Sequence, residues 1–285
     1  MKNETLLGEE DGLGMNEDGV GTWTPEKYRT FQLYAHQFTT GMKGKWTSLA
    51  YLDLYAGSGQ SRLENTNQVL LGSPLIALSL DVPFDRYVFC EKDSGKLADL
   101  KERVRRKFPD ATVKFVEGDC DDPSFKLGDA LPNGALTLCF VDPYRLDIRF
   151  DTLRTLAQGR SIDFLCLLAS RMDAGRNPHN YPREESTKLD RLLGSRDWRV
   201  KWKKLRSESA HEPNLGDFVC REFAANMESL GYLATELHEM KAIKTDEGRL
   251  IYHLALFSKS PVAKRYWQQA STYSQPQRDL FRPEV

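Results

Sequence analysis

The sequence lacks the features that mark several common classes of protein. Its 285 residues include only five cysteines, which are scattered and form no C-x-x-C pair, so neither a disulfide framework nor a zinc site is expected. Its apolar runs are far shorter than a membrane span, and no basic segment followed by an apolar one opens the chain. The net charge of -1 gives no overall attraction to nucleic acid or membrane. We therefore expect a cytoplasmic protein with buried free thiols and no metal.

The glycine-rich stretch at 51–59, YLDLYAGSG, lacks two signatures of nucleotide binding. No Gly-Lys-Ser/Thr follows its glycines, which excludes a P-loop. The dinucleotide fingerprint G-x-G-x-x-G has a third glycine for close helix–strand packing, but Arg62 stands at that position. What remains is an apolar run that ends in Asp53 and turns at Gly57 and Gly59. This is typical of the first strand of an open α/β sheet followed by a cofactor loop.

Four further apolar runs, separated by helical segments, predict a parallel sheet covered on both faces. A helix at 217–230 and a hairpin joined by Thr245-Asp246-Glu247-Gly248 follow them. We therefore predict a Rossmann-like class I methyltransferase sheet, with five parallel strands, a C-terminal antiparallel hairpin and an N-terminal helical extension. The predicted strands are about 49–54, 87–90, 113–116, 135–141 and 162–168, with 232–243 and 249–257 in the hairpin.

The amino-acid composition along the chain predicts three regions. Residues 1–22 are rich in Gly, Asp, Glu and Asn and predict a disordered lead-in, 23–270 form one methyltransferase-like domain, and 271–285 form a loose tail. The polar stretch 60–70 is predicted to be a long loop, which in an enzyme closes over the cofactor. The helix at 95–108 carries a basic face that we expect to be solvated, made of Lys96, Lys101, Arg103, Arg105, Arg106 and Lys107.

Residues 171–215 are predicted to be a basic insertion or lid. Between Arg183 and Arg206 the basic residues outnumber the acidic ones, and Tyr181, Trp198 and Trp202 lie among and just before them. Such a mixture suits nucleic acid, because it combines phosphate neutralisation with base stacking. The alternative is an amphipathic lid helix with a solvated face. The residues predicted to bind substrate are Arg176, Asn177, Lys201 and Lys203.

The strand ends suit S-adenosylmethionine (SAM). Asp53 and the Gly57–Gly59 backbone can face the amino-acid end of SAM, Glu91 can accept both ribose hydroxyls, and Asp119 can accept the adenine amine. A strand-end carboxylate can also simply cap a helix, so each residue alone leaves both interpretations open. The predicted cofactor-binding residues are Asp53, Tyr55, Ala56, Gly57, Gly59, Glu91, Lys92, Asp119 and Cys120.

Asp142-Pro143-Tyr144 follows the fourth strand, where the methyl acceptor should lie. It looks like the Asp/Asn-Pro-Pro-aromatic motif of amino-group DNA and RNA methyltransferases with one proline missing. In that motif the carboxylate accepts a hydrogen bond from the target amine and the aromatic ring stacks on the base, which must first leave a duplex. We predict these three residues to be catalytic. Asp142 could instead be a turn residue before Pro143.

The chain resembles the three-Cys-motif partner proteins (TcmP) over about residues 23–270. The resemblance implies a methyltransferase-like fold and a partner of the radical-SAM type. Two departures are Tyr55 for the usual Phe, and Arg145 where the family often has Gly, which bears on the acceptor geometry. The motifs shared are Trp23-Thr24 with Lys27, DLYAGSG, Gly72-Ser73-Pro74, Glu91, Asp142-Pro143-Tyr144 and Arg176-Asn177.

Together these features predict methyl transfer from SAM to a nucleobase amine in DNA or RNA. One alternative is a methyltransferase acting on a small molecule or a protein, in which the basic segment faces away from the cofactor. The other is a non-catalytic module that kept the fold and works with a radical-SAM-type protein.

Overall fold

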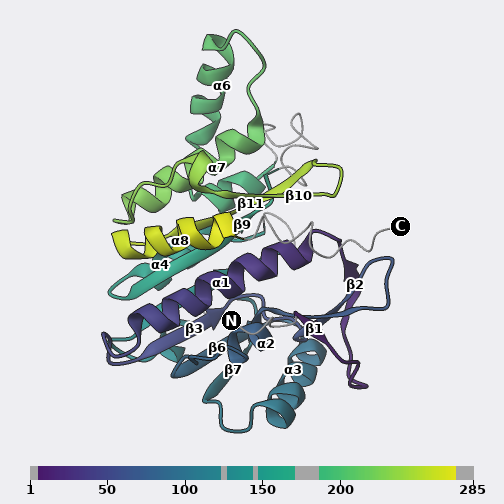
Figure 1. Cartoon of the computed structure of the whole chain (residues 1–285). Helices are drawn as coiled ribbons and strands as arrows, with labels where there is room; N and C mark the ends of the chain where they lie inside the picture. The colour runs from purple at the N-terminus through teal and green to yellow at the C-terminus, as the bar shows by residue number, and fades with distance from the viewer. Residues whose placement is uncertain (1–5, 123–126, 144–146, 171–185, 274–285) are drawn as a thin grey trace.

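The computed structural model describes residues 6–122, 127–143, 147–170 and 186–273. A seven-stranded sheet forms its centre, with the strand order β10-β11-β9-β8-β3-β6-β7 (Figure 1). Near-continuous apolar sequence makes most of these strands, as expected where helices cover both faces. The strands are β3 (Leu49–Asp53), β6 (Arg86–Glu91), β7 (Val113–Glu117), β8 (Leu136–Val141), β9 (Ser161–Leu168), β10 (Lys241–Lys244) and β11 (Leu250–Phe257).

The strand directions confirm the predicted fold. β3 pairs in parallel with β6 and β8, β6 with β7, and β8 with β9. β11 runs antiparallel to both β9 and β10. Five parallel strands followed by a hairpin that inserts its second strand beside the fifth is the arrangement of a class I methyltransferase sheet.

The first strand of the hairpin is shorter than predicted. The sequence indicates a strand over 232–243, but β10 begins only at Lys241. Before it, Glu236 and Glu239 form a capping box around a 3-10 turn, η3 (Leu237–Glu239), which interrupts the extended backbone. The Tyr232 hydroxyl donates to the carbonyl of Ile162 at 3.0 Å, so this segment is fixed to β9 by a side chain instead of a strand ladder.

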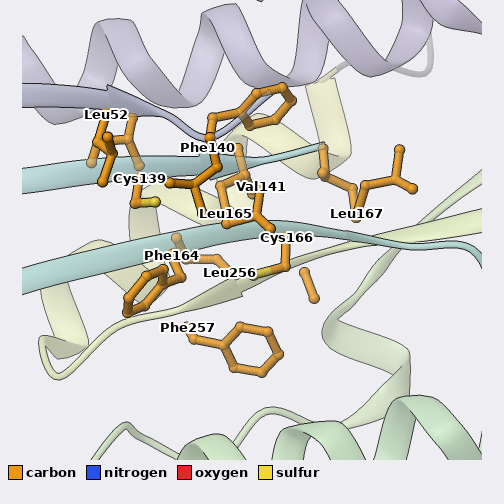
Figure 2. Packing of buried hydrophobic residues seen from close by; sticks show 14 of the residues in the cluster. Leu52, Cys139, Phe140, Val141, Phe164, Leu165, Cys166, Leu167, Leu256 and Phe257 are labelled. Carbon is orange, nitrogen blue, oxygen red and sulfur yellow. The ribbon is translucent and has the colours of Figure 1, made fainter. Parts of the chain in front are cut away.

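Helices cover both faces of the sheet (Figure 2). On one face, Phe140 of β8 packs on Phe31 of α1, with ring centroids 4.6 Å apart. On the other, Phe257 of β11 packs on Phe223 of α7, with centroids 5.5 Å apart. The helices are α1 (Thr24–Met42), α2 (Ser73–Leu78), α3 (Ser94–Lys107), α4 (Phe150–Ala157), α5 (Lys188–Leu193), α6 (Trp198–Glu208), α7 (Leu215–Ser229) and α8 (Pro261–Tyr273), with a 3-10 turn η1 (Leu127–Ala130).

A second, four-stranded sheet corrects two predictions. It has the order β1-β5-β4-β2 and joins β1 (Leu7–Gly8) and β2 (Asn16–Val20) to β4 (Gln60–Leu63) and β5 (Val69–Leu71). Residues 6–22 are therefore not a disordered lead-in, and 60–70 is a hairpin instead of an open loop. Their order comes from pairing with each other: β1 and β5 pair antiparallel, and β2 and β4 pair parallel.

The described part of the basic insertion is helical, which agrees with the amphipathic alternative, whereas the start of the tail differs from expectation. Within 171–215, α5 and α6 pack through Leu189, Leu192, Trp198 and Trp202, all at most 3% exposed. The predicted loose tail begins inside α8, which continues to Tyr273 because Trp267 and Ala270 bury its inner face. In the described parts of the chain, no helix has the length and apolar character needed to cross a membrane.

Candidate cofactor and acceptor site

The carboxyl ends of the parallel strands bring the predicted site residues to one edge of the sheet. Asp53, the last residue of β3, lies opposite Phe89 of β6 and Phe140 of β8. Glu91 and Asp142 each follow those partners by two residues and therefore extend past the end of β3. This edge is where open α/β sheets bind their ligands.

The glycine loop and Glu91 are in direct contact. The backbone NH of Gly57 donates to Glu91 Oε2 at 2.8 Å, and Glu91 Oε1 accepts from the NH of Asp93 at 2.9 Å. Gly57 and Gly59 have φ of +60° and +87°, a region that residues with a Cβ rarely adopt. The structure thus brings together the predicted loop and the predicted ribose acceptor.

Asp53 hydrogen-bonds to the start of this loop and is buried. It is 0% exposed and accepts from the Tyr51 hydroxyl at 2.8 Å and from the NH of Tyr55 at 3.2 Å. Burial raises the pKa of Asp53 to about 6, although hydrogen bonds from Ser73 and Tyr51 act in the opposite direction. Asp53 is fully buried, whereas Glu91 is partly exposed, so Asp53 sets where the loop begins and Glu91 keeps acceptor capacity that a ligand can reach.

The remaining predicted cofactor residues lie around the same edge with different exposure. Ala56 is buried and its NH donates to the carbonyl of Cys90 at 2.9 Å. Lys92 and Asp119 are exposed. Cys120 is 5% exposed, and burial raises the pKa of its thiol, which contacts the Tyr55 hydroxyl.

Asp119, Cys120 and Asp121 place three ligand-type atoms within 4.8 Å of one another. The carboxylate of Asp121, however, already accepts from Thr152 Oγ1 at 2.6 Å and from the NH of Arg149 at 3.1 Å. Asp119 Oδ1 in turn accepts from the NH of Asp121 at 2.9 Å. These bonds fix the turn after β7 and give the cluster a structural role.

Asp142 forms a buried ion pair with Lys27 of α1. Lys27 Nζ lies 2.6 Å from Asp142 Oδ2, and the two side chains are only 10% and 13% exposed. Burial alone would lower the pKa of Lys27, but the adjacent carboxylate outweighs it and holds that pKa above its usual value. The ammonium also lies 4.5 Å from the ring centroid of Tyr28. The end of the sheet edge where the acceptor is predicted therefore carries a charge pair instead of an isolated carboxylate.

Tyr252 of β11 is a further polar group at this end. Its side chain is 4% exposed, and within the described chain its hydroxyl has no hydrogen-bond partner. Burial raises the pKa of Tyr252; the positive charge of Lys27 acts against this rise, and the negative charge of Asp142 adds to it. Sequence reasoning missed Tyr252, because it lies in the apolar run LIYHLALF, and assigned no role to Lys27, although it noted the Trp23-Thr24-x-x-Lys27 motif.

Among the other predicted site residues that the structure describes, Lys201 and Lys203 are not part of this arrangement. Lys201 Nζ pairs with Glu222 at 2.6 Å, and Lys203 is exposed on α6. Figure 1 shows α6 projecting from the body at the end opposite α3 and the small sheet. Tyr144, Arg176 and Asn177, as well as Tyr181, lie outside the described residues.

Of the two interpretations of the tryptophans, burial supports the amphipathic helix and contradicts base stacking. Trp198 and Trp202 are 2% and 3% exposed. Trp202 packs on Phe218 of α7 with centroids 5.1 Å apart, and Trp198 Nε1 donates to Asp190 Oδ1 at 2.8 Å. The two rings lie on the inner face of an amphipathic helix, and most of the basic residues of this helix lie on its outer face. The sequence therefore alternates between aromatic and basic residues although the rings are in the core.

No family model matches the sequence, and no curated protein matches it. Among solved structures, the chain is similar to Trm1 from Pyrococcus horikoshii in complex with SAM, at 10% identity and a TM-score of 0.46 over 89% of this chain and 61% of that one. It is also similar to TYW2 of M. jannaschii in complex with SAM, at 12% identity and a TM-score of 0.43 over 89% of this chain and 86% of that one. A third similar structure is magnesium protoporphyrin IX methyltransferase from Synechocystis with bound SAM, at 8% identity and a TM-score of 0.42 over 85% of this chain and 86% of that one. The chain spans about three fifths of the Trm1 chain. At these values the fold assignment rests on the strand order alone.

Proposed function

We propose that this protein is a SAM-dependent methyltransferase. The observation that carries the proposal is the contact between the Gly57 backbone and Glu91 at the carboxyl edge of a class I methyltransferase sheet. A carboxylate at the tip of the second parallel strand can accept both hydroxyls of a ribose. The glycine loop beside it can approach the amino-acid end of the same ligand closely.

The acceptor that we propose is an amine, of the kind that nucleobases carry. Lys27 binds Asp142 Oδ2, and no described residue donates to Asp142 Oδ1 or to the Pro143 carbonyl, so we propose that these two oxygens accept hydrogen bonds from an amine. Those bonds would hold the nitrogen so that its lone pair is aimed at the methyl group of SAM. Transfer is an in-line displacement in which the nitrogen–carbon bond forms as the carbon–sulfur bond breaks, so alignment supplies much of the rate.

Replacing Glu91 with Gln should weaken SAM binding by about 100-fold, because a neutral amide cannot accept from two ribose hydroxyls as a carboxylate does. Gln keeps one oxygen that can still accept from the Gly57 NH. Calorimetric titration of SAM measures the change, and Glu117→Gln is a matched control at an exposed position on β7. Equal affinity in Glu91→Gln and wild type would remove Glu91 from the site.

The acceptor is tested by offering methyl-labelled SAM with separate pools of RNA, DNA, protein and small metabolites from cells. Label in nucleic acid, lost on nuclease digestion before the reaction and lost in Asp142→Asn, is the expected result. Nucleic acid without label, with transfer to another pool, would contradict the nucleobase acceptor while leaving the methyltransferase intact.

A specific observation favours a second candidate, an acceptor that is a small molecule or a protein. The buried tryptophans of α6 provide no stacking surface for bases. In Figure 1, α6 lies at the end of the molecule opposite α3, the helix whose Arg103 contacts Ser58 of the glycine loop. A third candidate is the partner module, for which the TcmP resemblance is the support. It predicts that wild type fails to bind SAM and is recovered with a radical-SAM-type protein in a pull-down.

A further inference from the structure

Arg103 is a fully buried cation that the proposed reaction does not use. It lies on α3 among basic residues that the sequence places on a solvated face, yet it is 0% exposed. Its neighbour Arg105 is 72% exposed, as expected for that face. A buried guanidinium is costly unless its donors are satisfied, so its partners define what it does.

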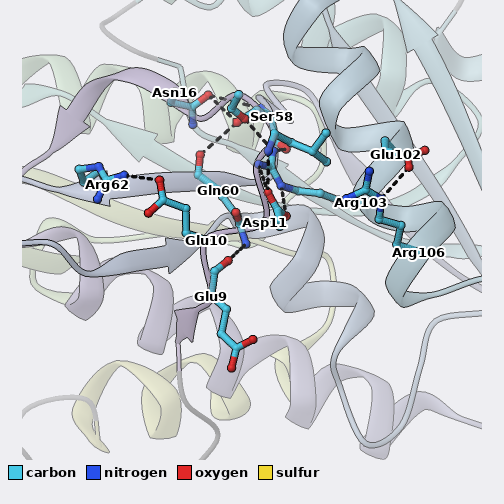
Figure 3. Close-up of polar contacts among 12 residues, drawn as sticks. Glu9, Glu10, Asp11, Asn16, Ser58, Gln60, Arg62, Glu102, Arg103 and Arg106 are labelled. Carbon is cyan, nitrogen blue, oxygen red and sulfur yellow. Dashed lines mark hydrogen bonds and ion pairs between the residues drawn. The ribbon is translucent and has the colours of Figure 1, made fainter.

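Four N–H groups of Arg103 reach two segments of the chain (Figure 3). Nε and Nη2 bind both oxygens of Asp11 at 2.9 Å. Nη1 donates to the carbonyl of Gly14 at 2.9 Å and to the carbonyl of Ser58 at 2.7 Å. Arg103 thus connects the N-terminal segment to the middle residue of the cofactor loop.

The same loop residue is held from every side. The NH of Ser58 donates to Asn16 Oδ1 at 3.3 Å, and its hydroxyl donates to the carbonyl of Gln60 at 3.0 Å. Asn16 Nδ2 donates to Ser61 Oγ at 2.8 Å, so the Asn16 amide closes over the loop. A Cβ on Gly57 would come within 3.1 Å of Asn16 Oδ1. The carbonyl, NH and hydroxyl of Ser58 are thus all hydrogen-bonded, which restrains its conformation.

We propose that Asp11, Asn16 and Arg103 are positioning residues of the cofactor site, and that the N-terminal segment 6–20 holds the Gly57–Gly59 loop in its ligand-binding shape. This inference rests on the proposed SAM site. In an unrestrained chain, the two glycines beside Ser58 could adopt many other backbone conformations. Fixing the Ser58 carbonyl from α3 and its NH from Asn16 removes those alternatives before the ligand arrives, which lowers the cost of binding.

The direct test compares Arg103→Lys and Asp11→Asn with Arg105→Lys in the full chain. Lysine keeps the charge but lacks the planar fork that binds Asp11 and reaches Ser58. Arg105 is the matched control, since it also makes a bidentate bond, to Glu102, on the outer face of the same helix. SAM affinity is measured by calorimetry at a temperature well below each variant's melting point. Hydrogen exchange at the amides of residues 57–59 is measured without ligand.

We expect Arg103→Lys and Asp11→Asn to weaken SAM binding by about tenfold or more and to speed exchange in the loop, because a broken buried pair leaves a charge unsatisfied. Arg105→Lys should change neither. Wild-type affinity and exchange in a folded Asp11→Asn would overturn the inference, even if Arg103→Lys does not fold. If wild type does not bind SAM, the proposed function is contradicted, and so is the role of these residues in cofactor binding. Hydrogen exchange at residues 57–59 then reports only whether Asp11 and Arg103 restrain the loop.

Discussion

Asp142→Asn should lower methyl transfer by about 100- to 1000-fold while leaving SAM affinity unchanged. The loss follows from removing a preorganised negative charge where the acceptor nitrogen becomes positive. The same variant should be destabilised by about 3 kcal/mol or more, because Lys27 keeps a buried charge with no counter-ion. The measurements are single-turnover transfer at saturating SAM and urea unfolding of the same preparation.

A double variant separates the catalytic effect from the structural one. Lys27→Met with Asp142→Asn removes both charges, and replacing a buried pair with neutral groups is often neutral for stability. We expect the double variant to recover most of the stability and none of the transfer. Recovery of transfer along with stability would show that Asp142 acts only through the fold. Full activity in Asp142→Asn would end its assignment as the acceptor residue.

Asp163→Asn should stabilise the protein above neutral pH and remove a pH dependence. Asp163 on β9 is 5% exposed and bonded to the Tyr34 hydroxyl at 3.4 Å, and burial raises its pKa to about 7. A carboxyl whose pKa is raised by folding binds its proton more tightly in the folded state. Its stabilising contribution is therefore present below about pH 4 and is lost as the pH rises to about 7.

The size of this effect follows from the width of that window. Stability should fall by at most about 1.4 kcal/mol per pH unit across it, and the neutral amide should abolish the fall. The free energy of unfolding of wild type and Asp163→Asn is compared at pH 5 and pH 8. Asp151→Asn, at a side chain that is 55% exposed, is the control. Parallel pH curves for wild type and Asp163→Asn would mean that Asp163 is already ionised in the folded protein.

The parallel strands could be predicted because their signal is local. β3, β6 and β8 are short apolar runs that each end in, or are followed by, an acidic residue, and these acidic residues meet at one edge of the sheet in the structure. Glu91 and Gly57 were found in the same way, since both stand next to such runs. The hairpin was harder, because η3 interrupts a stretch whose composition still suits a strand.

The features that could not be predicted from the sequence depend on contacts between residues far apart in the chain. Residues 6–20 have the composition of a disordered segment, and their order comes from contacts with the hairpin at 60–71 and with Arg103, 92 residues after Asp11. Lys27 and Asp142 are 115 residues apart, so nothing in the local pattern joins them. Trp198 and Trp202 alternate with basic residues in a way that suits both a nucleic-acid surface and an amphipathic helix. Only packing against α7 decides between these two.

The measurement that tests the central claim most directly is a crystal structure with S-adenosylhomocysteine, the product left after methyl transfer. We predict that its ribose hydroxyls bond to Glu91, its amino-acid end lies on the Gly57–Gly59 loop and its sulfur faces Asp142. A complex with the ligand elsewhere, or crystals that remain empty at saturating concentration, would contradict the assignment of this sheet edge as a SAM site.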